Sequence, residues 1–128
     1  MPEAMVKLVY CVRKRDDLST EEFSRYWLDE HGPLVRSVRD RFPMARYVQS
    51  HTVQGPATDL VRASRGGAEP FDGITEVWVR RDDLEHGFGE SAGEADALLR
   101  EDEARFIDLE RSVVFFTEEH EIFGPDGS

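Results

Sequence analysis

The sequence has a single cysteine, an excess of acidic over basic residues, and no long apolar run. Cys11 alone excludes an internal disulfide, and its place in an apolar strand pattern indicates a buried, inert thiol. The formal net charge of −11 disfavours binding to nucleic acids and to anionic membrane surfaces. No stretch approaches about 18 continuous apolar residues, and the N-terminal segment lacks the pattern of a signal peptide. We therefore expect a cytoplasmic protein without a membrane role.

Several motifs of well-known chemistry are also absent. No glycine-rich phosphate loop follows a predicted strand, and the sequence has no G-x-S-x-G elbow. Metal-binding spacings such as His-x-x-x-His are missing, and in the segment 118–121 (EEHE) neighbouring side chains of a strand would point to opposite faces. These absences argue against a metal, a nucleotide cofactor and triad hydrolysis, and we expect a protein that works without a cofactor.

The composition indicates one folded domain. Hydrophobic residues make up 39% and charged residues 34% of the 128 residues, which suits a single packed core with a strongly solvated exterior. We predict that the domain spans residues 5–123 and that residues 124–128 form a disordered tail.

Strand patterns recur four times along the chain. Apolar residues alternate with period two over 5–13, 45–53, 72–80 and 111–123, which predicts four strands. The first of them is apolar on both faces, so we expect both sides of its sheet to be covered.

Two helical regions separate these strands. Ser19 and Glu22 form a capping box that begins a helix, whose apolar stripe contains Trp27 and His31. Gly32 and Pro33 then predict a kink or a restarted helix directly after His31. The stretch 82–110 is helical but interrupted by glycines, whereas 54–70 has the composition of a long mobile loop.

The order β-α-β-β-α-β predicts a ferredoxin-like α+β fold. Right-handed crossovers in this order give a four-stranded antiparallel sheet with both helices on one face. The uncovered face needs a partner, so we predict a homodimer with two-fold symmetry.

A family resemblance accompanies these patterns. The segments FSRYWLDEHGPLVR, RYVQSH, FDGITEVWV and ARFID together resemble the EthD family of dimeric α+β barrel proteins, from Met5 to about Phe123. The resemblance implies two chains that pair their sheets, each with a pocket between sheet and helices. It leaves the reaction open, because the family includes oxidoreductase-like proteins of ether degradation and dehydratases or decarboxylases of aromatic polyketides, and related barrels include isomerases and cofactor-free oxygenases.

Histidines and one aspartate are the candidate catalytic groups. His31 lies on the sheet-facing helical stripe, His51 shares a strand face with Tyr47, and Asp72 begins the neighbouring strand. If these faces converge, the imidazoles transfer protons and Asp72 orients them or acts as the base. The expected walls of the pocket are aromatic: Tyr47, Trp27, Trp78, Phe106 and Phe115.

Each of these residues also has a structural interpretation. His31 suits a core hydrogen bond at the Gly32 irregularity, and His51 suits a contact with a partner chain. Asp72 precedes a glycine and suits the end of a loop. The two tryptophans are equally suited to the core or to an interface.

The leading functional hypothesis is an enzyme that acts on a hydrophobic cyclic or aromatic small molecule, as a cofactor-independent lyase, isomerase or oxygenase. Its alternative is a non-catalytic ligand-binding or accessory dimer. A third hypothesis is a haem-binding or haem-degrading barrel, which Trp78 and a nearby His86 suggest by resemblance. Against haem, the sequence has no asparagine, and Lys7 stands in the first strand where such enzymes tend to carry one.

Overall fold

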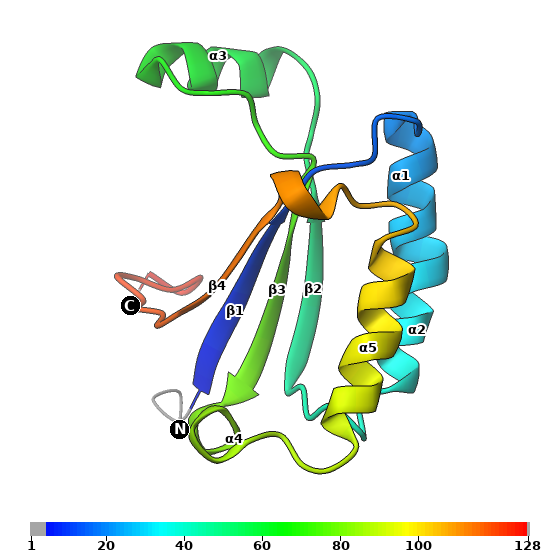
Figure 1. The fold of residues 1–128 in the computed structure, drawn as a ribbon. Helices are drawn as coiled ribbons and strands as arrows, with labels where there is room; N and C mark the ends of the chain where they lie inside the picture. The colour runs from blue at the N-terminus through cyan, green and yellow to red at the C-terminus, as the bar shows by residue number, and fades with distance from the viewer. Residues whose placement is uncertain (1–4, 128) are drawn as a thin grey trace.

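Four strands form one antiparallel sheet in a computed structural model that describes residues 5–127 (Figure 1). In the order in which they lie side by side, they are β2 (Arg46–His51), β3 (Gly73–Arg80), β1 (Met5–Val12) and β4 (Val113–Thr117). All three pairings are antiparallel, with Val9 opposite Glu76 on one side and Phe115 on the other. This is the predicted ferredoxin-like α+β fold.

One face of the sheet carries the long helical elements (Figure 1). They are α1 (Thr20–Tyr26), the π-helical turn η2 (Trp27–His31), α2 (Gly32–Ser37) and α5 (Ala92–Glu103). Short helices α4 (Arg81–His86) and η3 (Leu109–Arg111) connect the remaining segments. In residues 5–127 no helix is long and apolar enough to span a membrane.

The predicted capping box begins α1. The Ser19 hydroxyl accepts from the amide of Glu22 at 3.1 Å, and the Glu22 carboxylate accepts from the amide of Ser19 at 2.8 Å. The irregularity predicted after His31 is a π-helical turn, because the N–H of Gly32 donates to the carbonyl of Trp27, five residues earlier. α2 begins at that point with Gly32, and its second residue is Pro33, which has no N–H to donate.

Two predicted segments differ from the structure. The expected loop 54–70 contains α3 (Pro56–Arg65), because Pro56 suits the first helical turn and Gly66, at φ 59°, suits a helix end. α3 buries no side chain and projects from the rest of the molecule (Figure 1). The last strand ends at Thr117 and not at Phe123, since Thr117 pairs with Lys7 close to the beginning of β1 and little strand remains for further pairing. The tail 124–127 forms a turn closed by a backbone hydrogen bond, and Ser128 lies outside the described residues.

The core fills the space between the sheet and the helices. One cluster centres on α1 and η2, and the other lies between α2 and α5; their buried members are Val12, Phe23, Trp27, Phe106 and Ile107, and Val35, Val38, Ala95 and Leu99. The ring of Trp27 lies directly over Gly73, where an added Cβ would be 2.4 Å from Cζ3 of the tryptophan. Glycine is therefore required there by close approach.

The strand register separates the side chains into two sets. The helix face consists of Val6, Leu8, Tyr10, Val12, Tyr47, Gln49, His51, Thr75, Val77, Val79, Val114 and Phe116. The open face consists of Lys7, Val9, Cys11, Ile74, Glu76, Trp78, Val113, Phe115 and Thr117. Within the described residues no helix packs on the open face (Figure 1).

Candidate functional site

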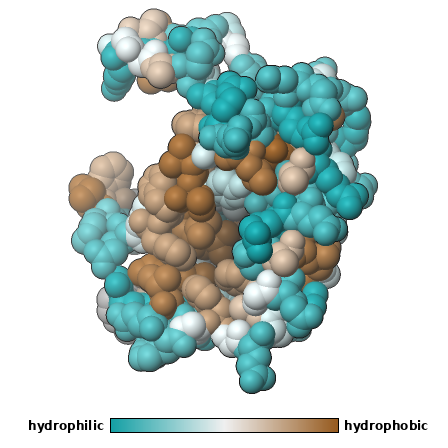
Figure 2. Space-filling model, viewed as in Figure 1, coloured by the Kyte–Doolittle hydropathy of each residue, from teal (hydrophilic) through white to brown (hydrophobic). Residues whose placement is uncertain are grey.

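A cavity of about 270 Å³ lies between the helix face and α5. Figure 2 shows it as a hollow with a hydrophobic floor. Its volume is close to the lower end of the range for ligand pockets, roughly 300–1,000 Å³. Apolar side chains form most of its wall, among them Leu8, Val77, Val79, Leu99, Val114 and Phe116.

His31 brings an ionisable group to this apolar wall. The π-helical turn ends at His31 and buries its side chain, of which 5% is exposed. Nδ1 of His31 lies 2.8 Å from Oδ2 of Asp102 on α5, and the Tyr26 hydroxyl donates to Oδ1 of the same carboxylate at 2.6 Å. A carboxylate only accepts, so Nδ1 carries the proton and Nε2 is left as the acceptor. Asp102 thus selects the tautomer of the imidazole.

The free nitrogen of His31 reaches the cavity. In residues 5–127 no buried side-chain nitrogen or oxygen lacks a hydrogen-bond partner. Asp102 is the one side-chain partner that His31 has in this part of the chain, so its Nε2 cannot be sealed in the core and is accessible from the cavity that it lines. Burial lowers the pKa of His31 and the contact with Asp102 partly opposes this, so the imidazole is neutral at pH 7.

A carboxyl group with unusual acidity faces the same cavity. Glu103 follows Asp102 on α5 and hydrogen-bonds with Tyr10 of β1. Burial raises the pKa of Glu103 to about 7, because the ionised form loses hydration that the hydrogen bond with Tyr10 only partly replaces. Burial and the neighbouring Glu103 raise the pKa of Tyr10 as well. The cavity therefore holds a basic imidazole and a carboxylic acid that is about half protonated at neutral pH.

His51 belongs to a separate hydrogen-bond chain. Nε2 of Gln49 donates to the carbonyl of Trp27 at 2.8 Å and to the Tyr47 hydroxyl at 3.0 Å, and these two bonds fix the orientation of the amide. Nε2 of His51 then donates to Oε1 of Gln49 at 2.8 Å. The His51 ring stacks on Trp27 with centroids 4.2 Å apart. Tyr47 and Trp27 line the cavity as expected, but His51 does not, contrary to the expectation from the sequence.

Asp72 does not line the cavity with His31. It directly precedes β3, and its carboxylate accepts from the amide of Lys14 at 2.8 Å. His31 contacts Asp102 instead, so the expected convergence of Asp72 with His31 is not found at this cavity. Trp78 and Phe115 lie on the open face, away from the cavity. Phe106 is fully buried, with its ring centroid 5.1 Å from that of His31, and it does not line the cavity.

Asp102 and Glu103 were missed by the sequence analysis although a signal existed. They lie on α5 seven and eight residues after Ala95, and three and four after Leu99, which are both buried. At the helical period these positions continue the apolar stripe. Two adjacent acidic residues that continue an apolar stripe indicate carboxyl groups on the side of α5 that faces the sheet.

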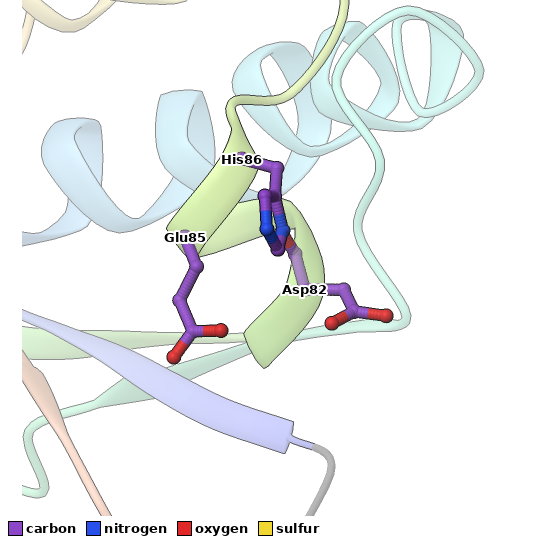
Figure 3. Close-up of side chains that lie close together, drawn as sticks. All are labelled: Asp82, Glu85 and His86. Carbon is purple, nitrogen blue, oxygen red and sulfur yellow. The ribbon is translucent and has the colours of Figure 1, made fainter.

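A second group of ionisable side chains lies on α4, at the surface. Asp82, Glu85 and His86 offer ligand atoms within 4.8 Å of one another, and Figure 3 shows the three side chains on one short helix. All three are exposed, and Nδ1 of His86 donates to the carbonyl of Asp82 at 3.0 Å. The haem hypothesis paired His86 with Trp78. Neither residue lines the cavity described above.

Comparisons with known proteins agree with this fold. A family model described as the EthD domain matches residues 15–110. An EthD-like protein from Ralstonia eutropha is 16% identical with a TM-score of 0.61, over 97% of this chain and 98% of that one. A hydroxynitrile lyase from Passiflora edulis is 17% identical with a TM-score of 0.57, over 96% and 100%. A dimeric protein of ferredoxin-like fold from Bacteroides fragilis is 12% identical with a TM-score of 0.54, over 91% and 97%. No protein of curated function matches the sequence.

Proposed function

This chain belongs to the EthD domain family, and we propose that it is a small-molecule enzyme that transfers protons on a hydrophobic cyclic or aromatic substrate. The observation that carries the proposal is the His31–Asp102 pair: a buried, neutral imidazole whose acceptor nitrogen is accessible from an apolar cavity. Proton-transfer groups with pKa values near the working pH are what general acid–base catalysis requires.

His31 acts as the general base. Its Nε2 accepts a proton from an acidic C–H or O–H group of the bound substrate, and the Asp102 carboxylate stabilises the imidazolium that forms. The Tyr26 hydroxyl holds the second oxygen of Asp102, so the carboxylate cannot rotate away from the ring. The hydrophobic wall excludes water and strengthens these electrostatic contacts.

Glu103 acts as the general acid. In its protonated form it donates a proton to a carbonyl or nitrile group of the substrate, and the Tyr10 hydroxyl orients it. Because Asp102 and Glu103 are adjacent on α5, one helix places both the acid and the support of the base around one cavity. A proton-shift isomerisation needs only such proton movements. A lyase reaction also breaks one bond of the substrate, with the base removing a proton and the acid protonating the group that accepts the electron pair. The fold that this chain shares with a hydroxynitrile lyase supports these types.

The active form is proposed to be a homodimer of one domain, residues 5–123. Apolar side chains on the open face are substantially exposed in one chain: Ile74 at 38%, Val113 at 46% and Phe115 at 46%. Pairing of two open faces would bury them, and one protein of the same fold is described as dimeric.

Exchange of an acidic C–H proton tests the proposal directly. The probe is 2-tetralone, a bicyclic aromatic ketone, whose α-protons are followed by NMR in D2O. We expect wild-type protein to accelerate exchange and His31→Gln to lose roughly a hundredfold or more of that rate. Asp102→Asn should lose a smaller factor, because it leaves the imidazole in place but no longer selects its tautomer.

His51→Gln is the matched control, since it removes a second histidine, half-buried, on the same side of the sheet. Its exchange rate should stay within about twofold of wild type, a change too small to come from loss of a proton-transfer group. Equal rates for wild type and His31→Gln, with both proteins folded by circular dichroism, would overturn the role of His31. Binding of 2-tetralone by wild type without any exchange would replace the enzyme by the non-catalytic ligand-binding alternative.

A further inference from the structure

A second hollow, separate from the cavity, runs between α2 and the edge strand β2. It is a groove of about 570 Å³. Three arginines line it: Arg36 from α2, Arg39 from the turn that follows, and Arg46 from the first position of β2. We call it the arginine groove.

Two arginines of this groove, Arg36 and Arg39, have no acidic partner in the described part of the chain. The whole sequence has 27 acidic residues against 16 lysines and arginines, and other arginines, such as Arg81 and Arg100, form ion pairs at 2.6 and 2.8 Å. The side chains of Arg36 and Arg39 make no hydrogen bond or ion pair among residues 5–127. Arg46 differs from these two. Its guanidinium lies over the ring of Trp78, 4.6 Å from the centroid, and its charge helps to lower the pKa of Glu119, so it is not a free cation.

A groove lined by free guanidinium groups is suited to an anion. The planar guanidinium donates two parallel hydrogen bonds to a carboxylate or a phosphate, and a concave site concentrates the field of its charges. In a chain of net charge −11 the surroundings repel anions. An anionic group is therefore expected to bind at the arginine groove and not elsewhere on this acidic surface.

The groove and the cavity share a wall. Val35, Met44 and Tyr47 line both hollows. The methionine is unbranched and flexible, so it can change rotamer to let a ligand extend from one hollow into the other. The hydroxyl of Tyr47 is held by Gln49, which lines the groove as well.

We propose that the arginine groove binds the anionic group, a phosphate or a carboxylate, of the same molecule whose apolar ring occupies the cavity. This inference rests on the proposed function, because it assumes that the cavity binds the ring. It assigns the substrate to a narrower class: a hydrophobic cyclic body that carries a negatively charged substituent.

Three ligands with one ring system test this inference: 2-naphthol, 2-naphthoate and 2-naphthyl phosphate, measured by fluorescence titration. We expect wild type to bind the two anions about tenfold more tightly than 2-naphthol. The phosphate should bind more tightly than the carboxylate if both of its negative charges contact guanidinium groups. In the double variant Arg36→Ala/Arg39→Ala this preference should fall to about twofold or less, while binding of 2-naphthol stays unchanged. Raising NaCl to about 1 M should reduce the preference in wild type, because salt screens exposed charges.

The control double variant is Arg25→Ala/Arg65→Ala, which removes two arginines that do not line the groove. It should keep the full preference for the anions. Equal affinity of wild type for 2-naphthol and for both anions would overturn the groove and leave the proposed function intact, since the ring would still bind.

Inorganic pyrophosphate, titrated by calorimetry, tests whether the groove binds an anion when the cavity binds no ring. If pyrophosphate binds wild type and not the Arg36→Ala/Arg39→Ala variant while none of the naphthyl ligands binds, the groove takes anions but the cavity takes no ring. That result would contradict the shared ligand and the proposed function together. An equal loss of anion preference in both double variants would show a general charge effect and overturn the assignment to this groove.

Discussion

Ionisable side chains on the two sides of the sheet have pKa values shifted in opposite senses: the charged form is favoured on the open face and the neutral form at the cavity. On the open face Lys7 pairs with Glu76 at 2.8 Å and with Glu119 at 3.2 Å, and these contacts raise the pKa of Lys7 above its ordinary value. The pKa of Glu119 is lowered by its hydrogen bond from Trp78 and by Lys7. Both groups are therefore charged throughout the physiological range. At the cavity on the helix side, Glu103 has no cation in hydrogen-bond contact among residues 5–127, and burial raises its pKa to about 7.

This difference suits the open face to dimer formation and the cavity on the helix face to proton transfer. Charges that are paired and partly hydrated keep one protonation state, which suits a surface that must stay soluble or meet a partner. Groups held beside an apolar cavity, where burial outweighs their charged neighbours, have pKa values shifted toward neutral pH, which suits proton transfer. The following variants test whether the two faces differ in this way, starting with the largest expected effect.

Gly73→Ala tests how tightly the helix face is packed. The new Cβ would lie 2.4 Å from Cζ3 of Trp27 and 2.7 Å from the carbonyl oxygen of Ser50, so the buried indole would have to move. We expect the free energy of unfolding to fall by about 3 kcal/mol, as for severe overpacking. Urea denaturation measures it.

Gly93→Ala is the matched control, because Gly93 lies in α5 and a Cβ there meets no atom within 4 Å. This variant should be unchanged or more stable by about 0.5–1 kcal/mol, since alanine favours helix. A loss of stability that is equal in the two variants would contradict the close approach of Trp27 to Gly73.

Phe115→Asp tests whether the open face is an interface. A charge at this exposed aromatic position should leave the folded chain intact but weaken dimerisation by roughly thirtyfold, about 2 kcal/mol. Light scattering over a concentration series measures the dissociation constant. Leu28→Asp, at an exposed leucine of η2 on the helical side, is the control and should leave dimerisation unchanged. A wild-type protein that is monomeric at micromolar concentration would contradict pairing through this face.

Glu103→Gln tests the buried carboxyl group through pH. Between pH 4.5 and about 7 the folded state binds a proton at Glu103 that the unfolded state has released, so wild type loses stability as pH rises through this window. Glutamine stays neutral, so the stability of the variant relative to wild type should rise by about 2–3 kcal/mol from pH 5 to pH 8.

The measurement is urea unfolding of both proteins at the two pH values. Glu101→Gln is the control, because the Glu101 side chain is 75% exposed on the same helix. Its difference from wild type should not depend on pH. A pH-independent difference for Glu103→Gln as well would contradict the raised pKa.

Lys7→Met gives the smallest effect and completes the comparison. Replacing an ion pair that is partly exposed should cost less than about 1 kcal/mol in the free energy of unfolding. The difference from wild type should shrink in about 1 M NaCl, because screening weakens such pairs. A larger loss in the free energy of unfolding that does not depend on salt would show that the Lys7 ion pair is as strong as a buried one, which would contradict the difference between the two faces.

Much of the fold follows from local sequence patterns. The capping box at Ser19 predicts the beginning of α1, and period-two alternation predicts four strands. The element order β-α-β-β-α-β then predicts a four-stranded antiparallel sheet with the helices on one face. The helix α3 was missed because Pro56 and Gly66, which bound it, also occur in loops. Its exposed residues provide no core stripe that would distinguish the two cases.

The candidate site was predictable only in part. Alternation alone determines that Asp72 and Trp78 share one side of their strand and that Tyr47, Gln49 and His51 share one side of theirs. It does not say which side faces the helices, because in β3 Ile74 and Trp78 are as apolar as Val77 and Val79. The packing of Trp27 over Gly73 shows which side of β3 faces the helices, and only the tertiary structure shows that Asp72 does not line the cavity. The partner of His31 is Asp102, 71 residues along the chain, and a contact of that separation depends on how α5 packs against η2, which no local pattern contains.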